Sequence, residues 1–205
     1  MTTRPATPEP TDTVASRPVV QHRVLHDGAV FDVVADHVDL GGEPVLREYT
    51  AHPGAAGVIA LDDEDRVLLL SQYRHPVRRE LWEPPAGLLD VEGEDPVAAA
   101  ARELAEEADL RAASWWRLVD FFTSPGSSDE SITVYLARDL SPVPHGDRYE
   151  RIDEEATMVA SWLPLDEAVA SVLGGRLHNP TAVVGILAAA AARAAGWSTL
   201  EVVTA

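Results

Sequence analysis

One expected helix carries an unusual concentration of acidic side chains. Glu103 and Glu107 are four residues apart and therefore share one helical face, while Glu106 lies at the edge of that face. Like charges at this spacing destabilise a helix by about 0.2–0.5 kcal/mol per pair, so their presence needs a reason. Clustered carboxylate oxygens suit Mg²⁺ or Mn²⁺ better than zinc. The spacing therefore indicates a site for a hard divalent cation.

The alternative is a solvated helix face without chemistry. Six acidic residues lie between Glu94 and Asp109, and Arg102 is the only base among them. A helix built for an exposed and stable face would alternate charges of opposite sign. The excess of acid therefore favours the metal site.

The helix itself is predicted from local signals. Asp95 is a good N-cap, and Pro96 follows at the first helical position, where its missing N–H costs nothing. The apolar residues recur at spacings of three and four, which predicts a buried stripe: Val97, Ala100, Ala101, Leu104 and Ala108. The acidic residues then face away from part of the core.

This segment resembles the Nudix box, the family pattern G-x5-E-x7-R-E-U-x-E-E-x-G-U, in which U is a bulky aliphatic residue. The matching positions are Glu94, Arg102, Glu103, Leu104, Glu106, Glu107 and Leu110. There are two departures: six residues rather than five separate Gly87 from Glu94, and Asp109 stands where the pattern has its second glycine. Asp tolerates the left-handed conformation of that position better than most residues. Both departures concern loop geometry rather than the carboxylates.

The resemblance implies hydrolysis of a nucleoside diphosphate linked to another moiety. It implies a metal-binding set: the backbone carbonyl of Ala86, Glu103, Glu106 and Glu107. Bound Mg²⁺ or Mn²⁺ would neutralise the diphosphate, polarise its phosphoryl oxygens and hold the attacking water. Glu94 and Arg102 are expected to orient the carboxylates, and an ordinary loop-to-helix ion pair is the alternative for these two.

Residues outside the box resemble the ADP-ribose pyrophosphatase subfamily. Pro125 follows Asp109 by sixteen residues, a distance similar to that of the subfamily's proline, although a plain Pro-Gly turn would explain it alone. Further matches are Arg47-Glu48, His52-Pro53-Gly54, Gln72-Tyr73-Arg74 and Leu81 to Gly87. The resemblance covers roughly residues 19–195.

In that subfamily the N-terminal strands are exchanged between two subunits and help to form each other's substrate site. The resemblance therefore implies a homodimer and a set of substrate-binding residues: Phe31, Arg47, Arg74, Pro125 and Glu130. A guanidinium fork suits phosphate oxygens, with a surface ion pair as the alternative for Arg47 and Arg74. Packing within a small sheet is the alternative for Phe31.

Similar enzymes carry their general base on a loop after the box. Here that loop is Ser141–Glu155, and Glu154 and Glu155 are the candidates at its end. A carboxylate of ordinary pKa, about 4.3, is already ionised at neutral pH and can accept a proton. The alternative is a solvated acidic run.

Composition narrows the class of partner. The chain has 205 residues, 34 acids and 16 bases, for a formal charge of −18, which disfavours nucleic acid and anionic membranes. The absence of cysteine excludes disulfides and thiolate metal sites. No apolar signal segment is recognisable, and the Ala-rich run Thr181–Ala192 is too short to span a bilayer. We expect a cytoplasmic protein.

The order of the expected helices and strands predicts an α/β fold. Residues 1–17 are expected to be a disordered tail, 18–55 a small antiparallel β subdomain used for dimerisation, and 56–205 a Nudix-type α/β/α sandwich. Strands are expected at Val19–Leu25, Ala29–Leu40, Pro44–Thr50, Trp116–Phe122, Ile132–Ala137 and Val159–Leu163, and helices at Leu165–Leu173 and Thr181–Ala195. Gly57–Leu61 and Val67–Leu70 flank a polar turn and are expected to form a hairpin.

The leading interpretation is a Mg²⁺- or Mn²⁺-dependent ADP-ribose diphosphatase that yields AMP and ribose 5-phosphate. Two alternatives stay open at this point. One is a Nudix hydrolase for another nucleoside diphosphate sugar or a damaged nucleotide. The other is a non-catalytic nucleotide-sensing module of the same fold, which the intact carboxylates at Glu103, Glu106 and Glu107 disfavour.

Overall fold

Two sheets form the body of the protein in a computed structural model that describes residues 10–151 and 157–205. The larger sheet has the order β11-β8-β9-β4-β7, with β4 (Ala55–Ala60), β7 (Ala86–Leu88), β8 (Leu110–Phe122), β9 (Ser131–Pro142) and β11 (Glu201–Val203). Only β4 and β9 pair in parallel within this sheet. An antiparallel sheet of order β10-β5-β6 contains β5 (Arg66–Arg74), β6 (Arg79–Glu83) and β10 (Val159–Pro164).

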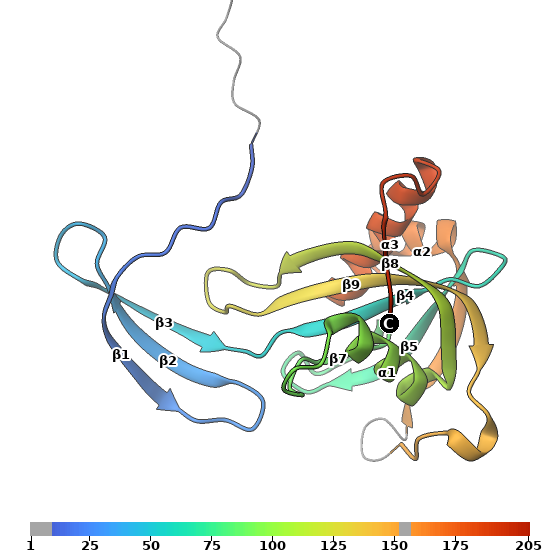
Figure 1. Cartoon of the computed structure of the whole chain (residues 1–205), viewed down its shortest axis with the longest axis horizontal. Coiled ribbons are helices and arrows are strands. Elements are labelled where there is room, and N and C mark those ends of the chain that lie inside the picture. The colour runs from blue at the N-terminus through green and yellow to red at the C-terminus, as the bar shows by residue number, and fades with distance from the viewer. Residues whose placement is uncertain (1–9, 152–156) are drawn as a thin grey trace, which may run out of the picture.

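Helices cover both faces of this body (Figure 1). Helix α1 (Pro96–Ala108) lies on one side, and α2 (Leu165–Leu173) and α3 (Pro180–Ala194) lie on the other. Because strand side chains alternate between faces, Val58 of β4 packs in the core with Leu104 of α1. Its neighbour Ile59 packs in the second core with Leu165 of α2 and Ile186 of α3. The expected α/β/α sandwich is confirmed.

The hairpin expected between Gly57–Leu61 and Val67–Leu70 was wrong. Strands β4 and β5 share a single bridge, Leu61 to Val67, and then enter different sheets. Strand β4 pairs with β7 and β9, and β5 pairs with β6 and β10. A strand buried on both faces appears in the sequence as a continuous apolar run, and such a run does not indicate which strands it pairs with.

An antiparallel N-terminal sheet extends away from the main body (Figure 1). It consists of β1 (Val19–His26), β2 (Asp32–Val38) and β3 (Val45–Ala51) in that order. Where β3 ends, the N–H of Thr50 donates to the carbonyl of Ser127 at 3.0 Å, and the N–H of Asp129 donates to the carbonyl of Thr50 at 3.3 Å. Residues 10–18 are exposed and carry no helix or strand, and the rest of the expected tail, residues 1–9, lies outside the described residues.

The other expected elements are present with shifted bounds. Strands β8 and β9 are longer than expected, so the following loop begins after Pro142 and includes a short 3₁₀ turn, His145–Asp147. Asn179 caps α3 by accepting a hydrogen bond from the N–H of Ala182 at 2.9 Å. No helix within residues 10–151 and 157–205 is long and apolar enough to cross a membrane.

Candidate active site

Helix α1 begins and ends as its sequence predicts. The carboxylate of Asp95 accepts a hydrogen bond from the N–H of Val97 at 3.1 Å, and Pro96 occupies the first turn. At the other end Asp109 has φ of 55° and donates its N–H to the carbonyl of Leu104. Asp109 thus takes the left-handed conformation that glycine takes in the box pattern, and the helix stops at the same place.

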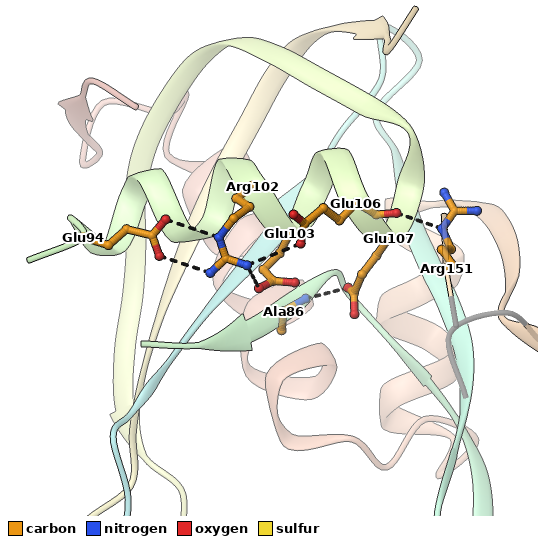
Figure 2. Close-up of polar contacts among 7 residues, drawn as sticks. All are labelled: Ala86, Glu94, Arg102, Glu103, Glu106, Glu107 and Arg151. Atoms are coloured by element: carbon orange, nitrogen blue, oxygen red, sulfur yellow. Dashed lines mark hydrogen bonds and ion pairs between the residues drawn. The ribbon is translucent and has the colours of Figure 1, made fainter. Parts of the chain in front are cut away.

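Arg102 lies at the centre of the acidic residues (Figure 2). Its guanidinium donates to both carboxylate oxygens of Glu94, at 3.3 and 3.1 Å, and to Glu103 Oε1 at 2.5 Å. A longer contact of 3.4 Å reaches Glu106 Oε2. The hydrogen bonding of its guanidinium to Glu94 is the largest cause that raises the pKa of Arg102 above its ordinary value, and the charge of Glu103 adds to it although burial opposes it. Arg102 therefore stays charged and contacts three carboxylates through one guanidinium.

The longer loop before α1 does not disturb this arrangement. A turn closes where the N–H of Glu94 donates to the carbonyl of Val91 at 3.1 Å, and Gly93 takes φ of 79°. A positive φ is readily available to glycine. Glu94 follows this turn, and its carboxylate accepts hydrogen bonds from Nε and Nη2 of Arg102. The turn therefore accommodates the additional residue before the site begins.

Two carboxylates of α1 lie against the backbone of β7 (Figure 2). Glu107 Oε2 accepts a hydrogen bond from the N–H of Ala86 at 3.0 Å. A β-carbon placed on Gly87 would lie 2.0 Å from Glu103 Oε1, so only glycine leaves room for that carboxylate. The helix and the strand thus hold Glu103 and Glu107 side by side at one interface.

The donor set fits a hard divalent cation by its chemistry. Glu103, Glu106, Glu107 and the carbonyl of Ala86 offer only oxygen atoms, and Arg102 alone does not balance the negative charge. No three His, Asp or Glu side chains in the described part of the chain converge on one point as a metal-binding group. Arg102 donates a hydrogen bond to Glu103, and the N–H of Ala86 donates one to Glu107, so both carboxylates are held by protein donors.

The structure brings together two of the five residues expected to bind substrate. Arg47 and Pro125 line one cavity of about 400 Å³ between the N-terminal sheet and the segment after β8, with Asp36 and Tyr49 in its wall. Asp36 is buried and accepts a hydrogen bond from Tyr49 Oη at 3.1 Å. Burial is the largest cause that raises the pKa of Tyr49 above its ordinary value, and the hydrogen bond to Asp36 adds to it. Phe31 lines a second cavity of about 510 Å³.

Arg74 and Glu130 are engaged within the protein. The guanidinium of Arg74 donates to the buried carboxylate of Glu83 at 2.7 Å. Glu130 accepts from Thr123 Oγ1 at 2.6 Å, and its other oxygen lies 3.7 Å from His52 Nε2. The contacts of Glu130 tie the end of β3 to the segment that carries Pro125.

Sequence reasoning missed one arginine beside the site. Arg151 donates from Nε to the backbone carbonyl of Glu106 at 2.8 Å (Figure 2). It also forms an ion pair with Asp109. Bases are scarce in this acidic chain, and that scarcity was the sequence signal that could have drawn attention to Arg151. The expected general bases, Glu154 and Glu155, lie outside the described residues.

A mixed sheet between helix layers, with a carboxylate-bearing helix packed on a short strand, is the architecture of the Nudix class. The NUDIX domain matches residues 51–181, and the chain belongs to this family. An ADP-ribose pyrophosphatase of Mycobacterium tuberculosis is 47% identical over 170 residues, which cover 82% of this chain and 81% of that protein. A methanol dehydrogenase activator of Bacillus methanolicus is 35% identical over 79% of this chain and 86% of its own length.

Solved structures agree on the fold. An ADP compounds hydrolase superposes with a TM-score of 0.72, at 18% identity, over 91% of this chain and 99% of the other. At that identity the likeness concerns the arrangement of helices and strands alone.

Proposed function

We propose that this chain hydrolyses the diphosphate of ADP-ribose to AMP and ribose 5-phosphate with the help of Mg²⁺ or Mn²⁺. The observation that carries the proposal is the pair Glu103 and Glu107, held together against β7 by Gly87 and by the N–H of Ala86. The substrate follows the ADP-ribose pyrophosphatase that shares 47% identity over most of both chains.

The contacts between Arg102 and Glu94 support the roles proposed for the box residues. Glu103, Glu106, Glu107 and the carbonyl of Ala86 would hold the cation, which when bound neutralises the diphosphate and polarises its phosphoryl oxygens. Arg102 and Glu94 orient the carboxylates, since each side chain binds the other through two hydrogen bonds. Glu154 or Glu155 accepts the proton of the attacking water as that oxygen bonds to phosphorus and the bridging P–O bond breaks.

The cavity between the N-terminal sheet and the Pro125 segment is the proposed place for part of the substrate. Arg47 supplies a positive charge there, and its guanidinium donates a hydrogen bond to the carbonyl of Leu46 at 2.9 Å. A guanidinium so placed suits a phosphate or a ribose oxygen. Phe31, Arg74 and Glu130 are proposed to line the approach to the same site.

A second copy of the chain is the proposed partner. Strand β1 is exposed along its whole length, and Val20, Val24 and Leu25 are 62%, 52% and 47% exposed. An exposed sheet edge with apolar side chains is a template for pairing with another chain. Light scattering after size exclusion should give twice the mass of the chain, and a monomer at micromolar concentration would contradict the homodimer.

Product analysis with a panel of diphosphates tests the activity. The purified chain is incubated with ADP-ribose, GDP-mannose, UDP-glucose and an oxidised nucleoside triphosphate, each with Mg²⁺, with Mn²⁺ and with EDTA. We expect AMP and ribose 5-phosphate from ADP-ribose only when metal is present. Faster turnover of another sugar nucleotide would move the substrate assignment, and binding without turnover of any compound would favour a nucleotide-sensing module.

A further inference from the structure

Asp109 does more than end helix α1. Its Oδ2 lies 2.8 Å from Nη2 of Arg151, and its backbone carbonyl accepts a hydrogen bond from the N–H of Val143 at 2.8 Å. Arg151 in turn donates from Nε to the carbonyl of Glu106 at 2.8 Å. One guanidinium therefore binds the last turn of the helix and the residue that follows it.

The contact occupies a position where a helix needs a partner. The last carbonyls of a helix have no intrahelical donor, and a positive charge there also favours the helix dipole. The side chains of Arg151 and Asp109 are 27% and 23% exposed, so the pair is shielded more than an ordinary surface ion pair. Because the guanidinium is planar, it can bind a carboxylate and a carbonyl in one fixed geometry.

We propose that Asp109 is a positioning residue: through Arg151 it sets the direction of the final turn of α1, and with it the carboxylates of Glu106 and Glu107. The inference rests on the proposed function, because those carboxylates are the expected cation ligands. Glu106 carries the carbonyl that Arg151 binds, and Glu107 is the next residue along the helix. A rotation of this turn would displace both side chains relative to β7.

A purely local role for Asp109 predicts a different result. If Asp109 only ended the helix, Asp109→Gly would be neutral or stabilising, because glycine takes a left-handed conformation at less cost. A positioning role predicts that the same variant folds normally but loses the Arg151 contact. Asp109→Gly therefore separates the two roles within one substitution.

The experiment compares Mn²⁺ binding and catalysis in the full chain. Free Mn²⁺ is measured by electron paramagnetic resonance in titrations of metal-free wild type, Asp109→Gly, Arg151→Ala and the double variant. Thermal unfolding and the kcat and KM for ADP-ribose are measured on the same samples. Arg111→Ala is the matched control, since Arg111 forms an exposed pair with Asp147 at 3.6 Å.

We expect each single variant to bind Mn²⁺ about tenfold more weakly, the usual effect of losing a group that orients metal ligands. Its kcat should fall by a larger factor than its KM changes. The double variant should be no weaker than Arg151→Ala, because that single variant has already lost the pair between Arg151 and Asp109. Wild-type Mn²⁺ affinity in Asp109→Gly would overturn the inference, as would an absence of Mn²⁺ binding by the wild type. A wild type that binds Mn²⁺ but hydrolyses no diphosphate would overturn only the proposed function, and the Mn²⁺ comparison would still decide the role of Asp109.

Discussion

The carboxylate of Glu103 occupies the space where a side chain on Gly87 would begin. A β-carbon at Gly87 would lie 2.0 Å from Glu103 Oε1 and 2.2 Å from its carboxyl carbon. No real contact is that short, so any substitution at Gly87 must displace the carboxylate. The glycine that opens the box pattern is thus required by packing against the helix that closes it.

Gly87→Ala should lower the activity by more than tenfold because Glu103 must rotate away from β7. The variant should remain folded, since the displaced group is the end of a flexible side chain. Steady-state hydrolysis of ADP-ribose and thermal unfolding measure the two effects. Gly146→Ala is the matched control, because a β-carbon there meets nothing within 4 Å, and equal activities of the two variants would contradict the prediction.

Glu107→Gln should abolish hydrolysis while leaving the fold intact. In the wild type the N–H of Ala86 donates to Glu107 Oε2 at 3.0 Å, and the amide oxygen of glutamine can still accept that hydrogen bond. The negative charge that a divalent cation needs is lost. Turnover and circular dichroism are compared with those of Glu201→Gln, which changes an exposed glutamate of β11. Retained turnover in Glu107→Gln would place the metal site elsewhere.

Arg102→Lys should reduce kcat by about 10- to 100-fold, the usual cost of losing a group that orients metal ligands. A lysine ammonium cannot bind Glu94 through two oxygens and Glu103 at once, as the guanidinium does. The Mg²⁺ concentration that gives half-maximal rate should rise in the same variant. Kinetics indistinguishable from wild type would mean that these contacts are only a structural ion pair.

Arg47→Ala should raise KM for ADP-ribose by about tenfold with a smaller change in kcat, because Arg47 lines a cavity whose wall contains none of Glu103, Glu106 and Glu107. Arg17→Ala, an exposed arginine outside the helices and strands, controls for the loss of a positive charge. A fall in kcat at unchanged KM would show that Arg47 acts on the reacting diphosphate instead.

The turn between β4 and β5 should give a pH-dependent contribution to stability. Burial alone would raise the pKa of Asp62, but hydrogen bonds from Arg66 and from the N–H of Glu64 outweigh it and lower the pKa below the ordinary value of 3.8. A group with a lowered folded pKa stabilises the protein above its unfolded pKa and loses that contribution as the pH falls through the folded pKa.

Asp62→Asn should therefore lower the free energy of unfolding by about 1 kcal/mol near neutral pH. The difference from wild type should shrink at pH values below 3.8. Urea unfolding near neutral pH and at about pH 3 measures it. Asp63→Asn, at the exposed neighbouring residue, is the control, and a difference of constant size across this range would refute the assignment to Asp62.

Local patterns in the sequence were enough to predict α1 and the spacing of its carboxylates. Asp95 and Pro96 set the start of the helix, and the positions of Glu103, Glu106 and Glu107 follow from 3.6 residues per turn. These features depend only on neighbours in the chain. The same is true of α3, whose cap Asn179 was recognisable from its type and place.

Tertiary structure decided what those local elements meet. The sequence could not show that β4 and β5 enter different sheets, because runs buried on both faces look alike whatever their partners. Nor could it show that Gly87 makes room for Glu103, or that Arg151, 45 residues after Glu106, binds its carbonyl. Such contacts join residues distant in the chain, and only the folded packing of helix, strand and loop brings them within hydrogen-bonding distance.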